Sequence, residues 1–147
     1  MDQINRDLIE SLLNEEDLNK ILQIAPYIKD SSILHFIAEK YNWDDGFELA
    51  RLIIDNPNTE LATALLLFYD GGGFEYLRDL LNKENIAEKP NFYFIDNLYR
   101  RLVRLEFVRG SIFYVPKLTK VQIYKFKKQN PNVSDLFYYG FQGDEIK

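Results

Sequence analysis

Apolar residues recur with the spacing of an α-helix along nearly the whole chain, so most of it is expected to be helical. Short groups of Gly, Pro, Asn and Asp separate the expected helices. The run 61–69 is apolar on nearly every side, which predicts a helix at the centre of the fold. The sequence therefore predicts an all-α fold of about eight helices in antiparallel pairs. A short α-solenoid-like stack is one arrangement of such pairs.

Two segments interrupt the helical period. Residues 85–90 end in a proline and are expected to form a loop. Residues 109–118 contain a glycine and a proline among β-forming residues, which predicts an irregular, extended segment. Directly after it, Thr119 and Gln122 have the spacing of a capping box, so a helix is expected to begin there.

The length and composition fit one helical domain over residues 1–147. The chain has no Cys, which excludes a disulfide framework, a thiolate zinc site and a cysteine nucleophile. Its polar, acidic N-terminus does not have the pattern of a secretory signal. The run 61–69 is far shorter than the roughly 20 residues that span a bilayer. We therefore expect a cytoplasmic protein with no membrane partner.

Charge is distributed unevenly along the sequence. Residues 1–90 contain 18 acidic and 8 basic side chains, a net charge of −10, whereas residues 91–147 contain 5 acidic and 10 basic ones, a net charge of +5. The two halves can neutralise each other inside one fold, or they can form two binding faces of opposite sign. Charge alone does not choose between these readings.

The sequence has none of the common catalytic or nucleotide-binding motifs, such as HExxH, a Walker-type loop or GxSxG. The glycines of segment 71–73 follow an apolar run and have no lysine placed to hold phosphate, so they are expected to end a helix. His35 is the single histidine. No metal ion or other cofactor is expected.

One group of residues could nevertheless form a binding site. Carboxylates beside an aromatic side chain can do acid–base chemistry or bind a hard cation, and at a helix start they also stabilise the helix dipole. For the pair Asp44 and Asp45 the capping role is favoured over a site. The candidate binding residues are His35, Trp43, Asp44, Asp45 and Glu48.

Basic residues gather in the C-terminal half. Arg100, Arg101 and Arg104 have the spacing of a stripe on one side of a helix. Four lysines surround two aromatic residues further on: Lys120, Lys125, Lys127 and Lys128 with Tyr124 and Phe126. Such patterns can bind nucleic acid, but the sequence pI near 4.9 argues against it. Solvated or internally paired basic faces are the favoured reading.

Aromatic residues are abundant, with 10 Tyr and 11 Phe. Large rigid side chains beyond the needs of a core are typical of protein interfaces. The densest stretch, residues 136–141, could anchor a partner or pack the end of the chain onto the body. The sequence leaves both open.

A resemblance adds to this reading. The stretch from Leu34 to Glu48, with its Tyr41-Asn42-Trp43-Asp44-Asp45-Gly46-Phe47-Glu48 core, resembles the bacterial domain-of-unknown-function family DUF4274, as do Asn56-Pro57-Asn58 and the block 63–69. The likeness covers residues 34–81 and extends more loosely to residues 118–122. It departs from the family pattern at Asp70-Gly71-Gly72-Gly73. The resemblance implies a small bacterial cytoplasmic protein, with relatives among polymorphic-toxin immunity proteins that act by binding. It supplies no catalytic residue.

Together these features predict a non-enzymatic protein-binding domain with a protein partner, in one form an immunity protein that neutralises a basic toxin. Nucleic acid is the least favoured partner. The alternative is an enzyme or a small-ligand binder that uses the region of His35, Trp43, Asp44 and Asp45.

Overall fold

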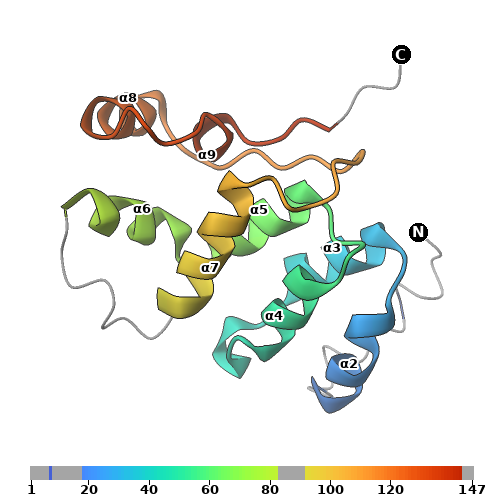
Figure 1. Ribbon diagram of the computed structural model, residues 1–147. Helices are drawn as coiled ribbons and strands as arrows, with labels where there is room; N and C mark the ends of the chain where they lie inside the picture. Colours follow the sequence, from blue (N-terminus) through green and yellow to red (C-terminus); the bar gives the residue numbers. More distant parts are fainter. Residues whose placement is uncertain (1–6, 8–17, 83–91, 144–147) are drawn as a thin grey trace.

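Figure 1 shows the computed structural model of the chain, which describes residue 7 and residues 18–82 and 92–143. Over these residues the chain forms eight α-helices and two short 3-10 helices. The α-helices are α2 (Leu18–Ile24), α3 (Ser31–Lys40), α4 (Glu48–Asp55), α5 (Leu61–Asp70), α6 (Gly73–Asn82), α7 (Phe92–Val103), α8 (Lys120–Gln129) and α9 (Leu136–Tyr139). The 3-10 helices are η1 (Ala25–Tyr27) and η2 (Trp43–Asp45). The predicted all-α fold is confirmed.

The irregular segment and the capping box also lie where the sequence predicts them. Residues 109–118 lead towards α8 without forming a helix. The Thr119 hydroxyl accepts a 3.1 Å hydrogen bond from the Gln122 N–H, and the Gln122 side chain accepts one of 2.8 Å from the Thr119 N–H. This reciprocal pair satisfies two backbone donors at the start of α8. The predicted loop at 85–90 lies outside the described residues.

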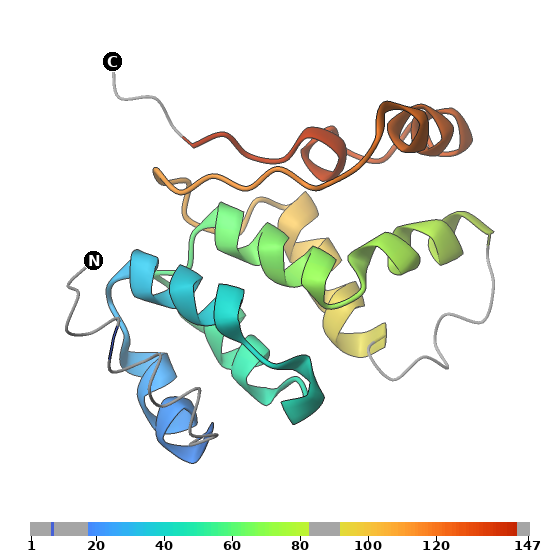
Figure 2. The ribbon, with the colours of Figure 1, turned by 180° about the vertical axis from the view of Figure 1, so that it is seen from behind.

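Helix α5 lies at the centre of the fold. It contacts α3, α6 and α7, and the two opposite views of Figures 1 and 2 show these helices around it. Seven of its ten residues are buried, which agrees with the central position predicted for the run 61–69. No helix in the described part of the chain, α5 included, combines the length and the apolar character needed to cross a membrane.

Residues 109–143 form a layer over α5 and α7, which we call the C-terminal layer (Figure 1). Its inner side is aromatic, because Phe137, Tyr138 and Phe141 are all buried. Of the two readings left open for the aromatic end of the chain, packing onto the body applies to these three residues. Tyr139, in contrast, is 47% exposed.

Phe68 of α5 is the centre of an aromatic cluster and is fully buried. Its ring centroid lies 5.1 Å from that of Tyr69, 5.3 Å from Phe137, and 6.2 Å from both Tyr76 and Tyr99. Tilted and edge-on ring pairs at these distances attract each other beyond the gain from burial. At these five positions the high Tyr and Phe content of the sequence therefore builds the core.

A buried carboxylate joins the start of α5 to the C-terminal layer. Glu60 accepts a 2.6 Å hydrogen bond from the Ser31 hydroxyl and a 3.1 Å bond from the Ile112 N–H. Gly110 makes the approach possible, since a Cβ atom there would lie 2.1 Å from Glu60 Oε1. Because a buried carboxylate needs hydrogen-bond partners, these contacts fix the position of the segment 109–118.

Truncating the central ring should therefore be costly. We expect Phe68→Ala to lower the free energy of unfolding by about 3–5 kcal/mol, because it removes a fully buried ring and leaves a cavity. Phe113→Ala is the matched control, because this ring is 66% exposed, and it should change stability by less than about 0.5 kcal/mol. Urea unfolding of both variants measures the difference. Equal effects would contradict the central role of Phe68.

Candidate functional site

Trp43 is one of the predicted site residues. It begins η2 and is part of an aromatic cluster. Its ring centroid lies 4.9 Å from Tyr41 and 5.9 Å from both Phe47 and Phe94. The indole also touches the end of α5, because a Cβ atom at Gly71 would lie 2.9 Å from its Cη2 atom. The half-buried Trp43 side chain thus packs the turn before α4 against α5 and α7.

The structure places neither Asp44 nor Asp45 at the N-cap position of α4. The N-cap of α4 is Phe47, whose side chain makes no capping hydrogen bond. The reason is local: η2 ends in Gly46 with φ of 96°, which turns the chain before α4 can begin. Asp44 is exposed, and its own N–H is capped by the Asn42 side chain at 3.0 Å. Glu48 is exposed in the first turn of α4.

His35 is directed to α5 and not to η2. Its Nδ1 atom lies 2.7 Å from the Thr63 hydroxyl, and its Nε2 atom lies 3.3 Å from Glu39. Burial lowers the pKa of His35 below its usual value, and the negative charges of Glu39 and Glu60 oppose this only partly. The ring is therefore mostly neutral at pH 7 and links α3 to α5.

The structure does not assemble the predicted binding group. Over the described residues, no hydrogen bond or ring contact joins His35 to Trp43, Asp44 or Glu48. The same residues contain no cluster of three His, Asp or Glu side chains arranged to hold a metal ion. The position of the Asp45 side chain lies outside what the structure describes.

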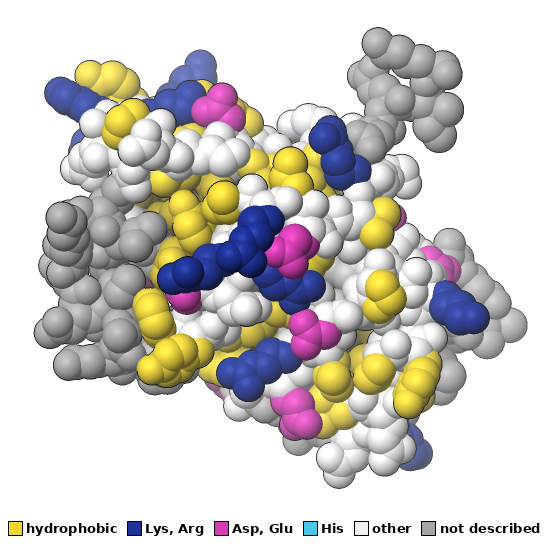
Figure 3. All heavy atoms as spheres, viewed as in Figure 1, with side chains coloured by type: hydrophobic (Ala, Val, Ile, Leu, Met, Phe, Trp, Pro, Cys, Tyr) yellow, Lys and Arg dark blue, Asp and Glu magenta, His cyan; other side chains and the backbone are white. Residues whose placement is uncertain are grey.

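The three arginines of the predicted basic surface are each paired with a carboxylate. Arg100 lies 3.0 Å from Asp96, and Arg104 lies 3.4 Å from Glu106. In the space-filling view of Figure 3, blue side chains at the centre of the face lie beside magenta ones. The favoured reading of this stripe, internal pairing, fits these contacts.

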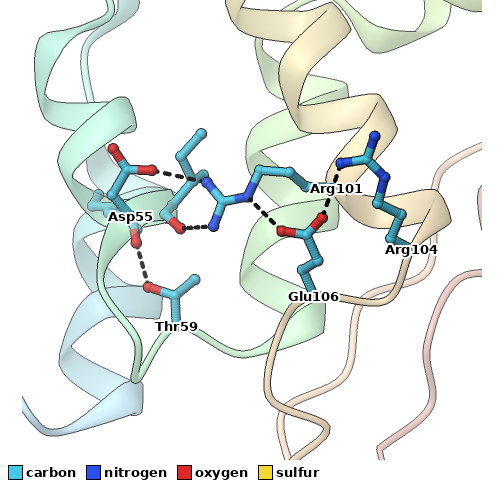
Figure 4. Close-up of polar contacts among 7 residues, drawn as sticks. Asp55, Thr59, Arg101, Arg104 and Glu106 are labelled. Atoms are coloured by element: carbon cyan, nitrogen blue, oxygen red, sulfur yellow. Dashed lines mark hydrogen bonds and ion pairs between the residues drawn. The ribbon is translucent and has the colours of Figure 1, made fainter.

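Arg101 is the most embedded of the three, with only 20% of its side chain exposed. Figure 4 shows its guanidinium between α4 and the turn after α7. It donates to Asp55 at 2.9 Å and to the Ile54 carbonyl at 2.8 Å, and its Nε atom lies 3.7 Å from Glu106. Arg101 thus bonds a carbonyl at the C-terminal end of α4 and holds α7 against it.

A different basic surface is exposed on α8. Five residues of this helix fall on one outward arc of about 140°, given about 100° per residue. They are Lys120, Val121, Tyr124, Lys125 and Lys128, and we call them the α8 surface. In Figure 3, blue and yellow side chains gather over α8 at the upper left of the view. Val121 is 61% exposed and Tyr124 is 65% exposed.

The lysines of the α8 surface differ from the arginines of α7. No ion pair joins Lys120, Lys125 or Lys128 to any residue in the described part of the chain. Lys127, by comparison, is used internally, with its ammonium 3.5 Å from Asp135 and 2.7 Å from the Tyr139 hydroxyl. The sequence pattern puts these four lysines in one group. In the structure, Lys127 is bonded internally, whereas the other three lie on the outward face of α8.

A pocket of about 420 Å³ lies where the end of α5 and the start of α6 meet the C-terminal layer, and we call it the α5–α6 pocket. Its lining residues are Leu66, Tyr69, Asp70, Phe74, Tyr114, Pro116, Lys117, Leu118 and Gln122. Sequence reasoning missed it, because its walls come from two segments that lie some forty residues apart. The one signal was an acidic residue at the end of an apolar helix, Asp70.

Comparison with known proteins gives a family but no activity. The profile of a family described as a domain of unknown function, DUF4274, matches residues 29–103, about half of the chain. This match spans α3 to α7 and ends before the C-terminal layer. Ent-trachylobane synthase KSL2, chloroplastic, from Ricinus communis is 28% identical over 151 residues, which cover 97% of this chain but 18% of that protein. No solved structure matches the chain.

The roles of the arginines can be tested by truncation. Arg101→Ala should lower the free energy of unfolding by about 2–3 kcal/mol, since it removes half-buried, charge-assisted hydrogen bonds to α4. Arg104→Ala removes an exposed ion pair and should cost less than about 1 kcal/mol. Denaturant unfolding compares the two. The assignment fails if Arg104→Ala is the more destabilising change.

His35 gives a pH-dependent test. Its folded pKa is lowered, so the unfolded chain takes up a proton first as the pH falls. Stability from this group is therefore complete above the unfolded pKa of 6.5 and is lost as the pH falls through the range below it. His35→Gln should flatten the decline in unfolding free energy between about pH 7 and about pH 5.5. NMR titration of the single histidine checks the pKa directly, and a value above 6.5 would contradict the assignment.

Proposed function

The chain belongs to the DUF4274 family, and we propose that it is a non-enzymatic protein-binding domain whose α8 surface contacts an acidic protein partner. One observation carries the proposal. The α8 surface combines exposed apolar side chains with lysines that have no ion pair in the described part of the chain. The other predicted basic group, on α7, is used inside the fold.

The chemistry of this surface matches an interface better than a reactive site. Tyr124 and Val121 provide apolar area, and a rigid aromatic side chain is a common anchor in protein interfaces. Lys120, Lys125 and Lys128 surround these two residues, and such a positive rim steers an acidic partner towards the surface. The partner should therefore present an apolar depression bordered by carboxylates.

The contact must extend beyond one helix. A stable protein interface buries about 800 Å² on each partner, which is more than a single helix face usually offers. Tyr139 is the nearest candidate extension, because it is 47% exposed and its hydroxyl accepts a hydrogen bond from Lys127 of α8. The α8 surface and Tyr139 both lie beyond the part of the chain that defines the family.

The family resemblance favours one form of this function, an immunity protein that masks a toxin. The partner would then be the toxin, and it would present its acidic side to α8. The sequence alone pointed to a basic toxin held by the acidic N-terminal half. We instead assign the contact to α8, because its lysines, which form no ion pair with any described residue, lie next to exposed apolar side chains.

The test compares two exposed tyrosines. A partner is captured from a lysate of the native host, purified, and titrated with each variant by calorimetry. Tyr124→Ala should weaken a 1:1 complex at least about tenfold, which corresponds to about 1.4 kcal/mol. Tyr27→Ala is the matched control, because Tyr27 is 81% exposed on η1, away from α8. It should change the affinity less than about twofold.

A second pair of variants tests the charge. Lys125→Glu and Lys29→Glu change the net charge equally, and both lysines are exposed. Only Lys125→Glu should slow association, and its effect should shrink at high salt. Equal effects of the two variants would contradict an α8 interface. Capture of nucleic acid in place of a protein, lost on nuclease treatment, would contradict the proposed partner.

A further inference from the structure

The α5–α6 pocket combines apolar walls with charged groups. Leu66 and Tyr69 come from α5, Phe74 from α6, and Tyr114 from the segment 109–118. The rings of Tyr69 and Tyr114 are stacked, with centroids 6.3 Å apart. A volume of about 420 Å³ lies in the range of small-molecule sites, which are usually apolar with a few placed polar groups.

Asp70 lies at a position where a negative charge is unfavourable. It is the last residue of α5, where the helix dipole is negative and a cation would be expected. Its carboxylate has no hydrogen bond or ion pair in the described part of the chain. Desolvation by the neighbouring side chains raises the pKa of Asp70, the charge of Lys117 lowers it, and that of Glu39 raises it. The residue is exposed at the pocket edge while its carboxyl group is partly desolvated.

Tyr114, in the aromatic wall of the pocket, is affected by the negative charge of Asp70. Burial, with a smaller contribution from the negative charge of Asp70, raises the pKa of Tyr114 to about 12. The Tyr114 hydroxyl is therefore protonated at all ordinary pH values and remains a hydrogen-bond donor. Asp70 and Tyr114 line the same pocket, so a carboxylate stands at the edge of its aromatic wall.

Lys117 supplies the opposite charge across the same pocket. Its side chain is exposed and lines the pocket together with Asp70. The two charges influence each other, yet no N–O distance between them is within 4.0 Å. Asp70 and Lys117 thus line one hollow without forming a direct ion pair with each other.

We propose that the α5–α6 pocket binds a small zwitterionic molecule with an apolar side group, of the α-amino acid class. The ligand ammonium group bonds the Asp70 carboxylate, and the ligand carboxylate bonds the Lys117 ammonium group. The apolar side group enters among Leu66, Phe74 and Leu118. The faces of the two stacked tyrosines add a favourable site for the ligand ammonium group. The ligand thereby supplies the partner that Asp70 lacks at the end of α5.

The pocket is separate from the α8 surface. Gln122 and Leu118 line the pocket, whereas Tyr124, Lys125 and Lys128 belong to the outward arc of the helix. Ligand binding can therefore be measured without the protein partner, and one of the two proposals can fail while the other holds.

The experiment uses the whole chain and three probes of similar size. L-phenylalanine has both charges, phenethylamine has only the ammonium group, and 3-phenylpropionate has only the carboxylate. Calorimetry or NMR titration should show L-phenylalanine binding at least about tenfold more tightly than either single-charge probe, because each of those probes lacks one of the two charged contacts. L-leucine should bind as well, since the apolar walls accept an aliphatic group.

Two near-isosteric variants assign the charges. Asp70→Asn should remove the preference of L-phenylalanine over 3-phenylpropionate, and Lys117→Gln should remove its preference over phenethylamine. Lys125→Glu is the control and should leave all three affinities within about twofold. Melting temperatures of all the variants confirm that they fold.

Three results would overturn the proposal. The first is that neither L-phenylalanine nor L-leucine binds at concentrations up to about 10 mM. The binding free energy would then be weaker than about −2.7 kcal/mol. The second is equal affinity for the three probes, which would show an apolar hollow without charge recognition. The third is an unchanged preference in folded Asp70→Asn and Lys117→Gln, which would place the zwitterion elsewhere.

Discussion

Helix α5 presents apolar side chains around its whole circumference, so it is stable only where other elements cover every side. Helices α3, α6 and α7 contact it directly, and the C-terminal layer lies over it and α7 (Figure 1). Its two ends also fix the neighbouring segments. Glu60, just before α5, bonds Ser31 and Ile112, and Tyr69, near its end, donates a hydrogen bond to the Phe137 carbonyl. The burial of one helix thus determines where the rest of the chain lies.

This arrangement decides which charged and aromatic residues remain for function. Phe68, Phe137 and their neighbours are buried in the core, and the arginines of α7 are paired with carboxylates. Helix α8 lies at the outside of the C-terminal layer and keeps an outward face of lysines, a tyrosine and a valine. The proposed interface is what remains exposed after the core and its ion pairs have formed.

The sequence predicts the features that depend on neighbouring residues. The helical period, the central position of α5 and the capping box of Thr119 and Gln122 are all local patterns, and the structure bears them out. The sequence does not predict contacts between segments that are far apart along the chain. Arg101 bonds Asp55, 46 residues away, and the α5–α6 pocket joins residues 66–74 to residues 114–122. Neither Asp44 nor Asp45 takes the N-cap position of α4, because Gly46 and Phe47 turn the chain before the helix begins, which residue types alone do not reveal.

Backbone amide hydrogen exchange, measured with and without the protein partner, tests the account most directly. In the free protein, amides of α5 should exchange only through global unfolding, because most of this helix is buried, whereas α8 should open locally. On binding, protection should appear in α8 and Tyr139. Exchange of α5 as fast as that of α8 would contradict its central role. Protection confined to residues 35–48, with α8 unchanged, would contradict the proposed interface and return attention to His35 and Trp43.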